Sequence, residues 1–467
     1  MEKLFKIKES GSNVKTEIIA GLTTFMAMSY ILMVNPGMFS DLDKGLFNAV
    51  FIATALSAIV GTVLIGLLAN LPLAQASGMG LNAFFVYTVC FGLGFTYANA
   101  LLFVLVDGLI FILLTLTGLR KVIFDAVPKR VRKIIPAGIG LFIAFIGFQD
   151  AKLVVNDDST LVKLASFNVL SKDFSWAATM PLVVTLITVL SIAVLSKKNV
   201  KGAIILSILG GTVLYYILGY ATVGGFSVSI DTLNPLVAFK DFGKLSFGKV
   251  FTEGFDFSAY LKNHSMSALV INFLTTALAF CMVDMFDTMG TLYGACRAGD
   301  MLVKNENGDE EVPRLNQAML ADAIATCTGA VCGTSTVTTY VEASAGTAVG
   351  GKTGLAAMVT AFMFLIAMFL SPVAALIPAC AYAAALIYVG ILMMGSVKDI
   401  QWNNPSVAVP SFLTLVMMPF TYNISYGIAF GLLSHVVIKL FTGKIKEVKI
   451  STWVITLLFV AMFILTH

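Results

Sequence analysis

The stretch GTSTVTTYVEASAG (333–346) interrupts an apolar region with threonine, serine, valine and tyrosine residues that lie between glycines. Residues of these types favour an extended backbone over a helix. Extended backbone persists at membrane depth only where protein covers it or where it lines a water-filled site, because lipid offers no hydrogen-bond partners. The stretch therefore predicts a broken membrane-spanning segment beside a solvated site.

Two carboxylates lie in otherwise apolar surroundings, Glu342 within that stretch and Asp287 within AFCMVDMFDTMGTLYGA (279–295). A carboxylate near the middle of a bilayer costs about 2.5–3.5 kcal/mol on insertion scales, so such an acid usually faces a cavity, a partner or a substrate path. We therefore expect both side chains to meet in one pocket midway across the membrane.

The composition indicates a polytopic membrane protein. Of the 467 residues, 58% are hydrophobic and 12% are charged, and the mean hydropathy is +0.91. At about 20 residues per crossing, the chain accommodates about 14 crossings. The net charge of +4 is small and dispersed over loops, which argues against nucleic acid as a partner. Six cysteines without CxxC spacing predict neither a disulfide framework nor a metal site.

The apolar segments form two groups around a polar stretch at 221–264. The first group lies at about 17–36, 47–69, 74–92, 98–118, 134–150, 176–195 and 202–220, and the second at about 268–296, 315–333, 334–349, 355–377, 380–397, 405–421, 423–441 and 450–466. Because the second group exceeds seven, we expect one of its last three segments to be short, re-entrant or at the surface. An odd number of crossings in each half inverts the second half, as in inverted-repeat transporters. A break in the third segment, ASGMGLNAFF (76–85), corresponds under this repeat to the break at 333–346.

Basic residues gather in loops that share one side of the membrane if every segment crosses. Cytoplasmic loops carry the excess of lysine and arginine, so the N-terminus is expected in the cytoplasm. The clusters are Lys3, Lys6, Lys8 and Lys15, then Arg120, Lys121, Lys129, Arg130, Arg132 and Lys133, then Lys197, Lys198 and Lys201. The stretch 221–264 is then extracellular and the loop 297–314 cytoplasmic, while the side of the C-terminus stays open.

With these features in view, the chain resembles nucleobase permeases of the xanthine/uracil permease superfamily, in the microbial branch that carries adenine, guanine and hypoxanthine. The similarity runs nearly end to end. Its markers are EIIAGLTTFMAMSYILMVNP (17–36), GMGLNAFF (78–85), FDTMGTL (286–292), MLADAIAT (319–326), GTSTVTTYVEASAG (333–346) and GGKTGL (350–355).

This resemblance implies an all-α membrane fold of 14 segments in a seven-plus-seven inverted repeat. A core domain would comprise 15–118 and 265–377, a gate domain 134–220 and 378–467, and 221–264 would link them outside. Short strands in segments three and ten would pair at the centre. The resemblance also implies purine import across the cell membrane by proton symport, an elevator-type movement of the core, and no cofactor. Relatives often form homodimers through the gate domain; the sequence leaves the oligomeric state and the choice between proton and sodium open.

By motif position, the resemblance places substrate-binding acids at Asp287 and Glu342, a polar position at Thr291 and a strand residue at Asn82. A purine base is flat, neutral and edged with N–H donors and with carbonyl or ring-nitrogen acceptors. A carboxylate that accepts N–H bonds suits one edge, and bonds to a charged group are stronger than neutral ones. One of the two acids is also expected to carry the coupled proton.

Other contacts are expected from the backbone and from two rings. Unwound backbone near Asn82 and Val341 keeps hydrogen-bonding groups free for the ligand. The rings of Tyr340 and Phe84 are candidates to stack on the base. Ser77 stands where many relatives have proline, so a looser turn is expected there.

Three further acids are not assigned to the substrate. Asp107 and Asp322 are expected to form interhelical hydrogen bonds. Asp284 lies three residues before Asp287, at a position that varies in the family.

Two other transport functions compete with this one, an ion channel and an anion carrier of the sulfate or bicarbonate type. A channel needs a continuous polar pore, whereas the acids here gather at helix breaks. An anion carrier should present cations at its centre instead of two carboxylates. An enzyme is disfavoured, because no nucleophile, base and orienting group occur together. By overall resemblance the preferred substrates are hypoxanthine and guanine, with adenine open.

Overall fold

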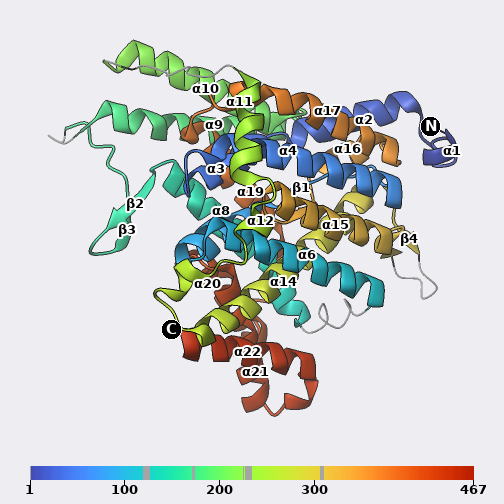
Figure 1. Cartoon of the computed structure of the whole chain (residues 1–467), viewed down its shortest axis with the longest axis vertical. Helices are drawn as coiled ribbons and strands as arrows, with labels where there is room; N and C mark the ends of the chain where they lie inside the picture. The colour runs from blue at the N-terminus through green and yellow to red at the C-terminus, as the bar shows by residue number, and fades with distance from the viewer. Residues whose placement is uncertain are drawn as a thin grey trace.

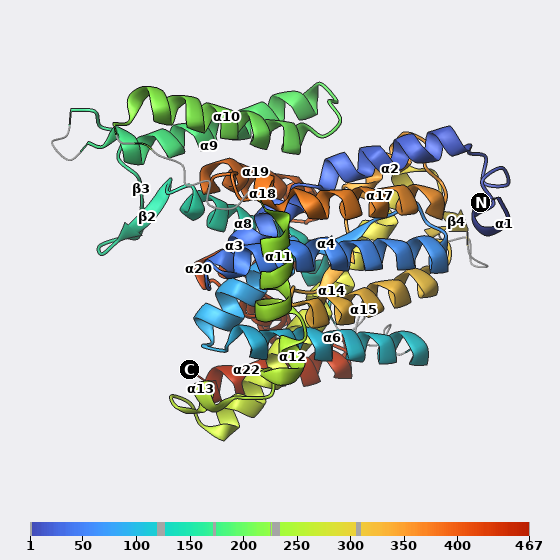
Figure 2. The same cartoon turned by 45° about the horizontal axis from the view of Figure 1, so that its top comes forward.

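The computed structural model describes residues 2–118, 127–170, 174–224, 226, 234–304 and 310–466. Long helices run side by side along one direction (Figures 1 and 2). Within the described residues, ten helices are long and apolar enough to cross a membrane. The multi-pass architecture is thereby confirmed, whereas the count of 14 crossings, the inverted repeat and the homodimer stay predictions.

The chain up to the polar stretch is mainly helical, with one buried strand. Its α-helices are α1 (Glu2–Phe5), α2 (Val14–Met28), α3 (Ile31–Ser40), α4 (Leu46–Leu64), α5 (Met79–Ala83), α6 (Tyr97–Thr117), α8 (Lys129–Asp150), α9 (Trp176–Lys197) and α10 (Ala203–Thr222). The π-helical turns η1 (Ile65–Ala69) and η2 (Phe84–Gly92) continue α4 and α5, and the strands are β1 (Gln75–Ser77), β2 (Val154–Asp157) and β3 (Leu161–Leu164).

The remainder has the same character. Its helical elements are α11 (Pro235–Asp241), η3 (Phe242–Ser246), α12 (Lys249–Thr252), α13 (Ser258–Leu261), α14 (Met266–Ala298), α15 (Leu315–Cys332), α16 (Ala343–Ala348), α17 (Gly354–Ala367), η4 (Met368–Leu370), α18 (Ser371–Ala374), α19 (Ala379–Met393), η5 (Met394–Asp399), α20 (Pro405–Phe420), α21 (Ile424–Phe441), η6 (Ile445–Glu447) and α22 (Ile450–Thr466). Its strands are β4 (Val303–Lys304), β5 (Glu310–Glu311) and β6 (Val337–Thr339).

Capping side chains mark where several spans begin. Thr96 and Asn99 form a reciprocal capping box at the start of α6. Asn404 caps α20 ahead of Pro405, and Asn423 caps α21. Such caps satisfy the first N–H groups of a helix, which have no partner within it. These polar residues therefore separate the apolar spans from their connections.

Strands β1 and β6 pair antiparallel at the centre of the molecule. The register is Gln75 with Thr339, Ala76 with Thr338 and Ser77 with Val337, and all six residues are buried. Hydroxyl groups of adjacent helices complete the backbone bonds: Thr62 of α4 donates to the carbonyl of Gln75 at 3.2 Å, and Thr326 of α15 donates to that of Val337 at 3.1 Å. The predicted strands in segments three and ten are thus confirmed, and protein supplies the partners that lipid lacks.

Gly333 allows the chain to turn from α15 toward β6. Its φ of +91° lies in the left-handed region, which residues with a Cβ rarely adopt. A Cβ at this position would lie 2.0 Å from Oγ of Ser246. Only glycine therefore fits both the conformation and the space.

The all-α expectation needs one correction beyond the central pair. The connections also contain two hairpins, β2 with β3 and β4 with β5. In the hairpin of β2 and β3, both strands carry β-branched residues: Val154 and Val155 on β2, and Val162 on β3. These polar connections lack the regular spacing of apolar residues that favours a helix. Their local strand propensity therefore determines the structure.

Parts of three predicted connections lie outside the described residues: Arg120 and Lys121, residues 305–309 of the loop 297–314, and residues 225 and 227–233 of the stretch 221–264. The described remainder of 221–264 is folded, because α11 and η3 pack against α4.

Two sets of helices pack separately around the centre. Helices α4, α14 and α15 contact the strand pair, α6 packs on α14 and α15, and α17 packs on α4 and α2. In the other set, α8 packs along α19 and α20, and α9 along α10. The N-terminus and β4 lie at one end of the molecule, and β2, β3 and the C-terminus lie toward the other (Figures 1 and 2). Figure 2 shows α9 and α10 displaced toward the β2–β3 end relative to α4, α6 and α15. The turn between α9 and α10 lies beside Met26, a residue near the middle of the first apolar segment. A Cβ on Gly202, in that turn, would be 3.1 Å from the Met26 side chain. This contact agrees with the offset.

Candidate functional site

A cavity of about 630 Å³ lies beside the strand pair. One wall comes from the elements around that pair: Tyr30, Gly78, Met79, Gly80, Phe286, Asp287, Gly290, Thr291, Thr338, Thr339, Tyr340, Val341, Glu342 and Ser344. The opposite wall comes from α8, α19 and η5: Pro136, Val389, Leu392, Met393 and Ser396. The cavity therefore lies between the two helix sets and is mostly apolar, with two carboxylates.

Glu342 reaches the cavity from the residue that precedes α16. Its side chain makes no capping bond to its own helix. Instead, the hydroxyl of Tyr30 donates to Oε1 of Glu342 at 2.6 Å. One carboxylate oxygen is thus held by the first apolar segment, and the residue lines the cavity.

Asp287 reaches the same cavity from α14. Thr338 of β6 donates to its Oδ2 at 3.3 Å. Asp287 and Glu342 are close enough to interact electrostatically. The expected meeting of the two acids in one pocket is therefore what the structure shows, each with one oxygen bonded to a hydroxyl of the protein.

Three other predicted residues also line the cavity. The hydroxyl of Thr291 donates back to the carbonyl of Asp287 at 2.9 Å, so it has no spare hydrogen for a ligand in this arrangement. Tyr340 donates across the strand pair to the carbonyl of Ser77 at 2.5 Å, which leaves its ring on the cavity wall. Val341 is 46% exposed and borders the opening.

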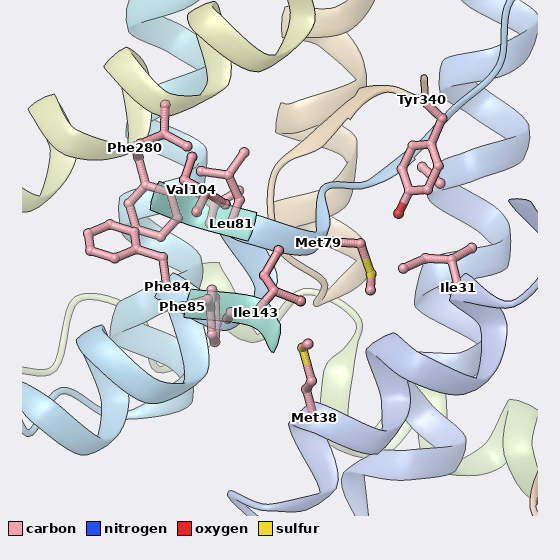
Figure 3. Packing of buried hydrophobic residues seen from close by; sticks show 14 of the residues in the cluster. Ile31, Met38, Met79, Leu81, Phe84, Phe85, Val104, Ile143, Phe280 and Tyr340 are labelled. Carbon is pink, nitrogen blue, oxygen red and sulfur yellow. The ribbon is translucent and has the colours of Figure 1, made fainter. Parts of the chain in front are cut away.

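The two remaining predicted residues do not line the cavity. Asn82 is buried and donates to the carbonyl of Ser77 at 3.3 Å. Phe84 is fully buried, and its ring lies 4.8 Å from that of Phe280. Figure 3 shows Met79 pointing toward Tyr340, whereas Phe84 lies on the other side with Phe280. The expected stacking by Phe84 is therefore wrong, because the turn of α5 into η2 directs that side chain into the helix packing.

The expected looser turn at Ser77 is also not found. Ser77 belongs to β1, and its hydroxyl lies 2.7 Å from that of Thr334. Its carbonyl accepts bonds from Tyr340 and Asn82. Hydrogen bonds thus hold this position.

Of the two acids predicted to form interhelical bonds, Asp322 does so, whereas Asp107 is bonded to the non-helical segment before β6. Asp322 accepts from Gln75 at 3.0 Å and from Thr288 at 2.8 Å, which joins α15 to β1 and α14. Asp107 of α6 accepts from Thr336 at 3.3 Å. Asp284 is buried beside this network and does not border the cavity.

Tyr30 was not identified from the sequence. Tyrosine in membrane proteins concentrates at the two interfaces, so a tyrosine halfway along a span is a signal of a buried polar partner.

Gly80, one of the two glycines in the predicted break at 76–85, allows close helix packing. A Cβ on Gly80 would lie 2.4 Å from Cγ2 of Ile139, so the two helix sets approach closely beside the cavity.

The cavity lies toward the end that bears the N-terminus. On α8 it touches Pro136, near the helix start, whereas α8 ends at Asp150, close to β2 at the other end. Among the described residues, no group of three or more histidine, cysteine, aspartate or glutamate side chains could hold a metal ion.

At the opposite end the two helix sets touch in what we call the far-end contact, formed by Tyr87 and Thr88 with Tyr422. The hydroxyl of Thr88 donates to the carbonyl of Tyr422 at 2.7 Å, and the rings of Tyr87 and Tyr422 lie 6.1 Å apart. Tyr87 also donates to Asp41 at 2.7 Å. Burial raises the pKa of Asp41 above its ordinary value, although the bond from Tyr87 opposes the rise.

Comparison of the sequence with known families and proteins gives a consistent result. The model of the Permease family for xanthine and uracil carriers matches residues 15–430. A guanine/hypoxanthine permease of Bacillus subtilis is 37% identical, over 99% of this chain and 100% of its own. An adenine permease of Escherichia coli is 34% identical over 98% and 95%, and a putative permease of Methanocaldococcus jannaschii is 38% identical over 99% and 98%.

Solved structures with a similar fold are anion transporters. The transmembrane domain of a cyanobacterial bicarbonate transporter superimposes with a TM-score of 0.59 at 15% identity, covering 89% of this chain and 97% of that one. The transporter SLC26A9 gives 0.61 at 11% identity, covering 92% and 66%. At such identities the likeness concerns the fold alone.

Proposed function

Because the chain belongs to the Permease family of xanthine and uracil carriers, and is thus a transporter and not an enzyme, we propose that it imports purine nucleobases. The expected substrates are hypoxanthine and guanine, with adenine as a further one. The observation that carries the proposal is the pair of carboxylates, Asp287 and Glu342, on one cavity between the apolar helices. Its volume falls within the range of about 300–1,000 Å³ usual for small-molecule sites.

The free groups of the cavity suit a neutral ring with N–H donors. Each carboxylate has one oxygen bonded to a hydroxyl, Thr338 or Tyr30, and one left for a ligand. Two such acceptors on one cavity match a base that donates from two ring positions. The ring of Tyr340 offers a flat apolar face, and backbone N–H groups at the start of α5 can donate to a ring carbonyl.

An anion carrier is the weaker alternative despite the shared fold. No lysine or arginine is among the described residues that line the cavity. Two carboxylates would repel a sulfate or bicarbonate ion that lacks a compensating cation. The purine proposal requires no such cation, because the ligand is neutral.

A binding panel on the purified protein in lipid vesicles tests this proposal. Guanine and adenine compete with labelled hypoxanthine, whereas uracil and sulfate do not. The matched control is 1,9-dimethylhypoxanthine, which keeps the ring but has no N–H donor and therefore does not compete. Competition by sulfate would support the anion carrier. If 1,9-dimethylhypoxanthine competed as well as unlabelled hypoxanthine, the carboxylates would not be binding N–H groups of the base.

We further infer that import is coupled to protons, since the acids in the cavity can bind one proton per cycle. In vesicles with an imposed proton gradient, hypoxanthine accumulates, and an uncoupler lowers the accumulation to the equilibrium level. Exchange of labelled for unlabelled hypoxanthine continues, because exchange needs no driving gradient. Accumulation that survives the uncoupler and follows a sodium gradient would contradict proton coupling and leave binding untouched.

The movement proposed for import is a displacement of the core against the gate. The core comprises the helices around the strand pair (15–118 and 265–377), and the gate the helices that face them across the cavity (134–220 and 378–467). Support comes from the offset of α9 and α10 in Figure 2 and from the cavity at one end with the far-end contact at the other. With the N-terminus in the cytoplasm of a cell-membrane protein, this arrangement is the inward-facing one.

A further inference from the structure

Tyr30 lies where the first apolar segment breaks. Helix α2 ends at Met28 and α3 begins at Ile31, so Ser29 and Tyr30 form the joint between them. The side chain of Tyr30 is fully buried. A buried tyrosine hydroxyl needs a hydrogen-bond partner, and in this joint the partner comes from a segment more than three hundred positions away in the chain.

That partner is the carboxylate of Glu342. The distance of 2.6 Å between the tyrosine oxygen and Oε1 lies in the range of charge-assisted O–H···O⁻ bonds. Glu342 makes no capping bond to α16, so its own helix does not fix its orientation. A glutamate has three rotatable side-chain bonds, and ordering them on ligand binding would cost conformational entropy.

From these contacts we propose that Tyr30 is a positioning residue for substrate binding. It holds Oε1 of Glu342 and so presents Oε2 to the cavity before the ligand arrives. The proposal deepens the proposed function and rests on it. Its consequence is that Tyr30 acts through Glu342. Its contribution to binding therefore disappears in Glu342→Gln, where the side chain that Tyr30 holds presents an NH₂ group to the ligand instead of an acceptor oxygen.

Tyr340 provides a matched control within the same cavity. It too is buried, lines the cavity and donates a hydroxyl hydrogen bond, but to the carbonyl of Ser77. Replacing either tyrosine by phenylalanine removes one hydroxyl and keeps the ring. The two variants therefore differ in whether the lost bond was made to the substrate-facing carboxylate.

The test is a double-mutant cycle on the full-length protein in lipid vesicles, with hypoxanthine as the ligand. Tyr30→Phe raises the Kd about tenfold, the effect of losing one bond to a charged group. In the Glu342→Gln background the same change alters the Kd less than about twofold, because the two residues act as one unit. Tyr340→Phe changes the Kd by the same factor in both backgrounds. A Tyr30→Phe effect of equal size in both backgrounds would overturn the proposal.

An infrared measurement needs no ligand. It tests the role of Tyr30 even if Glu342→Gln binds hypoxanthine too weakly for its Kd to be measured. The infrared carboxyl band that Glu342→Gln removes shifts in Tyr30→Phe and keeps its position in Tyr340→Phe. An unshifted band in Tyr30→Phe would overturn the role of Tyr30 while normal purine binding stands. Absence of purine binding by the unmodified protein would instead overturn the proposed function, so the two failures are distinguishable.

Discussion

The variants Asp287→Asn and Glu342→Gln each bind hypoxanthine about 10- to 100-fold more weakly than the unmodified protein, because a hydrogen bond to a charged group contributes about 1.5–3 kcal/mol. Each change keeps the size of the side chain and replaces an acceptor oxygen by an NH₂ group. That group faces an N–H edge of the base as a second donor, so one bond is lost and an unfavourable contact is gained. Binding is measured by equilibrium competition in vesicles, together with uptake.

Both positions retain their local supports in these variants. Thr338 can still donate to the remaining oxygen of the amide at position 287, and Tyr30 to that of the amide at position 342, so the fold is expected to persist. Asp158→Asn is the matched control, since Asp158 is exposed in the turn between β2 and β3. Its affinity and uptake should equal those of the unmodified protein. Unchanged hypoxanthine affinity in both acid variants would remove the carboxylate pair from the site.

The central strands could be predicted because their signal is local. Thr336, Val337, Thr338 and Thr339 are β-branched and lie between glycines, a composition that disfavours a membrane helix in any context. The requirement for backbone partners at membrane depth then implies that the segment is covered by protein. The meeting of Asp287 and Glu342 followed from the cost of two isolated charges in lipid.

The contacts of individual side chains could not be predicted in the same way. Asn82 and Phe84 lie within the predicted break at 76–85, but the helix that begins at Met79 turns both away from the cavity. Such directions depend on the phase of a helix, which changes by about 100° per residue and is set by the exact start. Tyr30 was missed for another reason: its place halfway along a span indicates a buried polar partner, but that partner, Glu342, is 312 positions away in the sequence.

The relation between the two helix sets is a property of the whole fold and has no local signal. Gly80 and Ile139 bring α5 and α8 together beside the cavity. Thr88 and Tyr422 bring η2 and the α20–α21 turn together at the other end. A sliding movement that opens the cavity to the far side must break the second contact, which makes that contact a direct test of the mechanism.

Linking the far-end contact covalently abolishes uptake. The variant carries Thr88→Cys and Tyr422→Cys in a background without the six natural cysteines, and a short bifunctional thiol reagent with a cleavable disulfide joins the two positions. The hydroxyl of Thr88 and the backbone carbonyl of Tyr422 are 2.7 Å apart, so the two positions are close enough for a short link. The link fixes the core against the gate, so uptake of labelled hypoxanthine falls to that of empty vesicles and returns on reduction.

Binding separates this effect from general damage. The linked protein still binds hypoxanthine from the side on which the cavity opens, because the link is remote from Asp287 and Glu342. A control link between Asn48→Cys and Asp241→Cys joins α4 to α11, two elements that pack together on the core side and whose side chains are 3.0 Å apart. This control link leaves uptake intact, because it joins parts that move as one body. Undiminished uptake with the far-end link fully formed would exclude a movement of the core against the gate at this contact.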